Sequence, residues 1–117
     1  MQLDERLKTR KITPSLIDYI VEKIVNHVSP EKIILFGSFA RGQANEGSDL
    51  DLFIVLDSPV SNREMRRHID MLLWGRRFGV DLIVRKPEEI ARNLADNNPF
   101  YTQHILAEGK VIYERPD

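Results

Sequence analysis

Apolar residues return along the chain with two different periods, which predict helices and strands. Between Thr13-Pro14 and Ser29-Pro30 they recur every three or four residues, at Leu16, Ile17, Ile20, Ile24 and Val28. This period predicts a helix with one apolar face, and a threonine followed by proline is typical of a helix start. Lys32–Phe36 is apolar after its first residue, which predicts a short strand in the interior of a sheet.

The later elements follow from the same pattern. Ser61-Asn62-Arg63-Glu64 fits a capping box that opens a long helix, with Gly79 as its C-terminal stop. A further helix is expected from Pro87, a break at Asn97-Asn98-Pro99, and a short helix over 99–108.

Three more segments have the character of strands, at residues 50–56, 80–84 and 110–114. Strands alternating with helices at these lengths predict an α/β or α+β fold, with a small sheet covered by helices. The pattern leaves the order and direction of the strands open.

Composition narrows the class of protein. A length of 117 residues predicts one domain spanning 1–117, whose residues 1–12 form either a loose arm or a helical lead-in. A net charge of -1 argues against a general nucleic-acid coat, and the lack of cysteine excludes disulfides and thiol chemistry. The longest apolar run, 52–56, is far shorter than the ~20 residues of a membrane helix. We therefore expect a cytoplasmic protein without a membrane partner.

Three acidic residues are unusual in the predicted strands. Asp49 and Asp51 lie two positions apart, so their side chains are expected to share one face of the sheet. Paired carboxylates repel each other, and their hard oxygens suit Mg²⁺ or Mn²⁺. Asp81 interrupts an apolar strand and would complete a two-metal site for nucleotidyl transfer if the two strands are neighbours. The alternatives are a solvated strand start for the first pair and an arginine salt bridge for Asp81.

A glycine and a serine follow the first predicted strand. Gly37 would let the backbone approach a ligand closely, and Ser38 offers a hydroxyl and an amide at a helix start, a site suited to an anion. Arg41 would then lie near bound phosphates or a carboxylate of the site. The alternative is an ordinary turn capped by serine.

Together these motifs resemble the signature of the DNA-polymerase-β-like nucleotidyltransferase superfamily. Its Gly-Ser…Asp-x-Asp motif is matched by residues 37–42 and 48–52, with ten residues between Ser38 and Asp49. The short chain is similar to the minimal nucleotidyltransferase (MNT) branch, which includes MntA-type antitoxins encoded beside HEPN-domain toxins. The resemblance covers residues 33–84 well, and implies the polymerase-β-like fold with a single small mixed sheet.

The resemblance also implies an activity: Mg²⁺-dependent transfer of AMP from ATP to a hydroxyl group. It assigns catalysis and metal binding to Asp49, Asp51 and Asp81, and nucleotide binding to Gly37, Ser38, Arg41 and Ser48. Family members usually recognise the acceptor through an additional domain, which this sequence does not show. We therefore expect a second protein, a HEPN-type toxin ribonuclease forming a hetero-oligomer with this chain, to supply the acceptor, a tyrosine hydroxyl.

Two rival interpretations stay open. One is a binding module that neutralises its partner by docking alone; the other is a different metal-dependent transferase, such as a glycosyltransferase, which would need a larger nucleotide-sugar domain. We do not expect a nucleic-acid partner, because no stripe of basic and aromatic residues is visible. The proposed chemistry requires no histidine. Four aromatic residues are expected to lie in the core or to face a partner, with an adenine platform among them as the alternative: Trp74, Phe78, Phe100 and Tyr101.

Overall fold

The computed structural model describes residues 4–116, which form a four-stranded mixed sheet in the order β3-β2-β1-β4. The strands are β1 (Lys32–Phe36), β2 (Leu50–Val55), β3 (Val80–Arg85) and β4 (Lys110–Glu114). β1 is antiparallel to both of its neighbours, whereas β2 and β3 are parallel. The predicted small mixed sheet flanked by helices is confirmed, and so is the interior position of β1.

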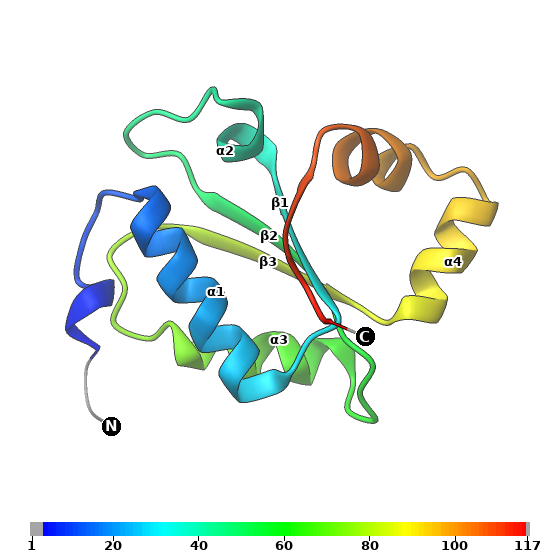
Figure 1. Cartoon of the computed structure of the whole chain (residues 1–117), viewed down its shortest axis with the longest axis horizontal. Helices are drawn as coiled ribbons and strands as arrows, with labels where there is room; N and C mark the ends of the chain where they lie inside the picture. Colours follow the sequence, from blue (N-terminus) through cyan, green and yellow to red (C-terminus); the bar gives the residue numbers. More distant parts are fainter. Residues whose placement is uncertain (1–3, 117) are drawn as a thin grey trace.

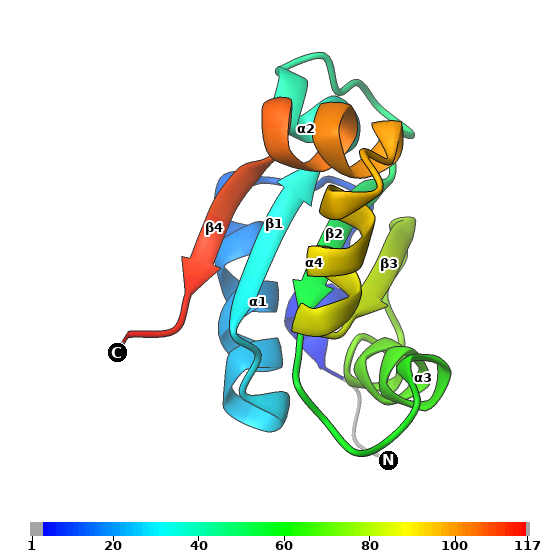
Figure 2. The same ribbon diagram turned by 90° about the vertical axis from the view of Figure 1, so that its right-hand side faces the viewer.

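Helices cover both faces of this sheet. Figure 1 shows α1 and α3 on one side of the sheet and α4 on the other, and Figure 2 shows the four strands side by side with α4 in front. The helical elements are η1 (Glu5–Leu7), α1 (Pro14–Val28), α2 (Gly37–Arg41), α3 (Asn62–Leu72), α4 (Pro87–Ala95) and the π-helix η2 (Phe100–Ala107). None of the helices within residues 4–116 has the length and apolar character needed to cross a membrane.

Alternation along β2 divides the core between the two faces. Leu50, Leu52 and Ile54 are fully buried against α1 and α3, whereas Phe53 and Val55 pack with Tyr101 and Ile105 of η2 on the opposite face. Side chains at i and i+2 of a strand point to the same face. Residues 49 and 51 therefore belong to the face that η2 covers.

The helix α3 departs from its prediction at its C-terminal end. Its start is as expected, since the Ser61 hydroxyl accepts a hydrogen bond from the Glu64 amide at 3.1 Å. The helix then ends at Leu72, because the following amides bond to carbonyls three residues back and Gly75 adopts a φ of +90°. The prediction that Gly79 stops this helix is wrong.

The segment before α1 is packed against the domain. Leu7 is 0% exposed and belongs to the core under α1 and α3. Asp4 accepts hydrogen bonds from the Tyr19 hydroxyl and, at 2.7 Å, from the Lys23 ammonium, while the Arg6 guanidinium lies over the Tyr19 ring. Residues 4–7 thus form a helical lead-in fixed to α1, and residues 1–3 lie outside the described part.

We expect Leu7→Ala to lower the free energy of unfolding by about 2–5 kcal/mol, because it removes a fully buried side chain from the core. Urea denaturation measures this change. The matched control is Met71→Ala on α3, where the side chain is half exposed and the change should stay within about 0.5 kcal/mol. Equal small losses in the two variants would show that residues 4–7 contribute nothing to stability.

Candidate active site

The parallel pairing of β2 and β3 brings the three acidic residues together. Asp51 lies directly opposite Asp81 in the register, and Asp49 immediately precedes β2. Directly paired residues of neighbouring strands point to the same side of a sheet, so all three side chains emerge on the face that η2 covers. The carboxylates therefore converge at one end of one face.

The end of β1 adjoins this group. Phe36, the last residue of β1, pairs with Asp51 across the antiparallel ladder, and Gly37 begins α2 directly afterwards. Figure 2 shows α2 at the end of the sheet where β1 ends and β2 begins. The glycine–serine turn and the carboxylates are thus neighbours, although ten residues of sequence separate Ser38 from Asp49.

Two glycines make room for the carboxylates. A Cβ atom on Gly37 would overlap the carboxylate of Asp51, and a Cβ atom on Gly79 would overlap that of Asp49. Gly37 also has a φ of +72°, a conformation that other residues adopt only at a cost. Sequence reasoning missed the role of Gly79; the signal was a glycine two positions before an acidic residue in an apolar strand.

The three carboxylates have no basic side chain in direct contact within the described residues. None of the side-chain hydrogen bonds or ion pairs within residues 4–116 involves Asp49, Asp51 or Asp81, so the alternative of an arginine salt bridge to Asp81 is not realised. Burial raises the pKa of the Asp51 carboxyl, and the charges of Asp81 and Asp49 raise the pKa further, against an opposing effect of Arg41. A site with this excess of negative charge favours the binding of a cation.

The donor set fits a divalent cation only in part. Carboxylate oxygens are the ligands that Mg²⁺ prefers, and Mg²⁺ commonly takes one or two protein carboxylates together with substrate phosphates. Within residues 4–116, however, no three acidic or histidine side chains are already arranged to hold a metal ion on their own. The three aspartates could hold Mg²⁺ with additional ligands from a bound phosphate chain.

The predicted nucleotide-binding residues lie around α2 and the loop that follows it. No side chain caps the N-terminus of α2, where Gly37 and Ser38 begin the helix. Arg41 reaches Glu108 at 3.5 Å and Gln43 at 3.2 Å, so its guanidinium is held near the end of η2. Ser48 instead closes its own loop, because its hydroxyl accepts from the Asn45 amide at 2.9 Å.

The aromatic residues take different places. Phe78 and Tyr101 are buried, and the Phe100 ring lies edge-on to both Phe36 and Tyr101. Trp74 is 50% exposed beyond the end of α3 and makes no aromatic contact within the described part of the chain. Core packing therefore accounts for Phe78 and Tyr101.

Known proteins share both the sequence pattern and the fold. Residues 16–107 match the family model described as "Nucleotidyltransferase domain". A Methanocaldococcus jannaschii protein named "Putative protein adenylyltransferase" is 31% identical over 112 residues, covering 90% of this chain and 74% of that protein. A second protein of the same organism and descriptive name is 35% identical over 86 residues, covering 71% of this chain and 78% of its own length.

Solved structures agree on the fold. A Sulfolobus solfataricus crystal structure, described as "a putative nucleotidyltransferase", superposes with a TM-score of 0.59 at 24% identity, covering 86% of this chain and 79% of that one. A toxin–antitoxin structure with AMP-PNP gives 0.54 at 19% identity, with coverage of 84% and 73%. A mutant of the MntA–HpeT toxin–antitoxin pair gives 0.51 at 18% identity, with coverage of 90% and 75%.

Alanine at Gly37 should be more destabilising than alanine at Gly42. Both glycines have a φ near +70°, which costs an alanine about 1–2 kcal/mol, but only at Gly37 would the new Cβ meet the carboxylate of Asp51. We expect the overlap to add roughly 1–3 kcal/mol and to displace Asp51 in a crystal structure of the variant. Equal losses of unfolding free energy for the two variants, with Asp51 in place, would contradict this contact.

Asp51→Asn should raise the melting temperature at pH 7 by a few degrees. The pKa of Asp51 is raised in the folded state, so the ionised form of Asp51 destabilises the fold. This destabilisation is lost as the pH falls through the pKa of the folded state toward the pKa of the unfolded state. Thermal melts should therefore show the gain at pH 7 shrinking under acidic conditions. Asp57→Asn, at an exposed position without an ion pair among the described residues, is the control; a gain independent of pH would refute the electrostatic cause.

Proposed function

We propose that this chain, which belongs to the nucleotidyltransferase domain family, transfers AMP from ATP to a hydroxyl group of a partner protein. The observation that carries the proposal is the meeting of three carboxylates, none of them in an ion pair within residues 4–116, beside a glycine–serine turn at one end of the sheet. The names of the two M. jannaschii relatives support protein adenylylation within the wider range of nucleotidyl transfer.

The reaction forms a phosphoester bond to the acceptor and breaks a phosphoanhydride bond of ATP. The acceptor oxygen bonds to the α-phosphorus of ATP, while the bond from that phosphorus to the oxygen bridging it to the β-phosphate breaks. AMP is thereby attached to the acceptor and pyrophosphate leaves. The hydroxyl proton passes to a carboxylate, and we assign this role to Asp81, which is exposed beside Asp51.

The residues around the site have separate tasks in this reaction. Gly37 and Ser38 hold the β- and γ-phosphates at the uncapped start of α2, and Arg41 adds a positive charge nearby. Asp49 and Asp51 would hold Mg²⁺, which when bound neutralises the phosphate charge and keeps the reacting groups in line. Ser48 acts through the shape of its loop, since its hydroxyl is occupied by Asn45.

The partner we propose is a HEPN-type toxin ribonuclease, modified on a tyrosine and thereby neutralised. The sequence resembles the MNT branch, and two of the structures that share the fold are toxin–antitoxin complexes, one of which contains AMP-PNP.

The test is transfer of label from α-³²P-ATP in the presence of Mg²⁺ to the product of the neighbouring reading frame. The wild type should label that protein, and Asp49→Asn/Asp51→Asn should label it at least ~10³-fold more slowly, because positioning of the phosphates and neutralisation of their charge supply most of this catalysis. Chelation with EDTA should abolish labelling by the wild type.

Asp57→Asn serves as the control, because this acid lies just beyond the opposite end of β2 and should leave the rate unchanged. No labelling by folded wild type would overturn the proposal. If Asp49→Asn/Asp51→Asn still neutralised the partner's toxicity in cells, the docking module would be the correct interpretation.

A further inference from the structure

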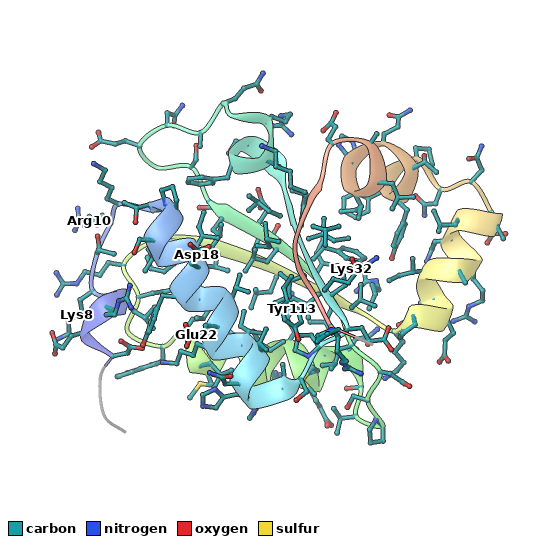
Figure 3. All side chains as sticks on the ribbon, viewed as in Figure 1. Lys8, Arg10, Asp18, Glu22, Lys32 and Tyr113 are labelled. Carbon is teal, nitrogen blue, oxygen red and sulfur yellow. The ribbon has the colours of Figure 1, made fainter. Side chains whose placement is uncertain are left out.

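A cleft of about 1200 Å³ adjoins the start of β2, and apart from Ser48 its lining residues have no part in the chemistry described above. The segment before α1, the loop that leads into β2 and the turn that leads into β3 form its walls. Its lining includes Arg10, Lys11, Phe39, Ser48, Arg77 and Gly79. In Figure 3, Arg10 is seen on the segment before α1, near the loop between α2 and β2.

The cleft reaches the active site at Asp49, at the start of β2. Ser48 immediately precedes Asp49, and Gly79 faces the Asp49 carboxylate across the start of the β2–β3 ladder. Gly37 lies on the other flank, beside Asp51. The cleft therefore ends next to Asp49, at the edge of the sheet where β2 and β3 begin.

The lining of the cleft carries an excess of positive charge. Arg10, Lys11 and Arg77 are all exposed, and none of them belongs to an ion pair within residues 4–116. Glu46 is the one acidic residue among the described residues of the lining. An unpaired basic surface of this kind attracts acidic partners and accelerates their association.

The basic wall is held in place rather than attached loosely. Leu7 is buried in the core, and Asp4 is bound by Lys23 and Tyr19 of α1, so Arg10 and Lys11 follow directly from an anchored turn. On the opposite wall, buried Phe78 anchors the backbone next to Arg77. Between the walls, Ile12 and Phe39 provide apolar surface that suits an aromatic side chain.

We propose that this cleft binds an acidic segment of the acceptor protein and delivers its tyrosine to the carboxylates. The inference rests on the proposed function. Acidic residues of the segment would pair with the three cations, and the neutral tyrosine would reach the end of the cleft next to Asp49. RNA is a poorer match, because its backbone would bring a negative charge at each nucleotide against the aspartates.

The test measures binding without ATP, by fluorescence anisotropy. The probes are a labelled peptide with one tyrosine among glutamates, the same peptide with glutamines, and a single-stranded RNA of equal length. We expect the glutamate peptide to bind at least about tenfold more tightly than the other two, and its affinity to fall with added salt.

Charge reversal of the cleft supplies the second arm. Arg10→Glu/Lys11→Glu/Arg77→Glu should weaken binding of the glutamate peptide at least about tenfold. Arg63→Glu/Arg66→Glu/Arg67→Glu makes the same change of charge at three exposed positions of α3 and should alter binding less than about twofold. Circular dichroism checks that both variants are folded.

Each failure has a separate meaning. Equal loss of binding in the two triple variants, or equal binding of glutamate and glutamine peptides, would overturn the cleft as the docking site. Tighter binding of RNA would overturn the choice of a protein segment. If the cleft bound the acidic peptide as expected while no AMP reached any protein acceptor, the proposed function alone would fail.

Discussion

The in-register parallel pairing of β2 and β3 is the constraint on which the site depends. Leu50, Leu52 and Ile54 are fully buried on one face, and this fixes which way the intervening residues point. A slip of one residue would turn every side chain of the strand to the other face. The core therefore forces Asp51 and Asp81 to share the opposite face, where they repel each other.

The fold accommodates this repulsion by keeping the carboxylates at the end of the sheet. Only Asp51 is partly buried, whereas Asp49 and Asp81 are exposed to solvent, where water lowers the cost of their charge. The glycines add the second condition, since Gly37 and Gly79 let the backbone lie against the carboxylates from both flanks. The close approach of the backbone and the repulsion between carboxylates both suit the binding of a ligand, and the repulsion lowers the stability of the fold. This combination is common at functional sites.

Local patterns were sufficient to predict most elements but not the contacts between them. Lys32–Phe36 and Lys110–Glu114 form strands as predicted, because a continuous apolar run and its neighbouring turn residues are local signals. The predicted end of α3 was wrong because the apolar period continues past Leu72 to Leu73 and Trp74 and so pointed to Gly79, whereas the chain turns at Gly75, with a φ of +90°. The sequence predicted that Asp81 lies near Asp51 only if the two strands are neighbours, because the order of strands in a sheet does not follow from local sequence. The packing of Leu7 gave no periodic signal at all.

The net charge of -1 also concealed how the charges are distributed. The aspartates meet on one face at the end of the sheet. The adjoining cleft is lined by Arg10, Lys11 and Arg77, which form no ion pair among the residues that the structure describes. Averaged over the chain, these two groups cancel, so composition alone argued only against a uniformly basic surface. Because the two groups are neighbours, each acts on a different part of one ligand. The cations attract the acidic groups of the ligand. The aspartates repel those acidic groups from the reaction centre unless a cation is bound there as well. A neutral hydroxyl at the end of an acidic segment satisfies both conditions, whereas a ligand charged along its whole length satisfies only the first.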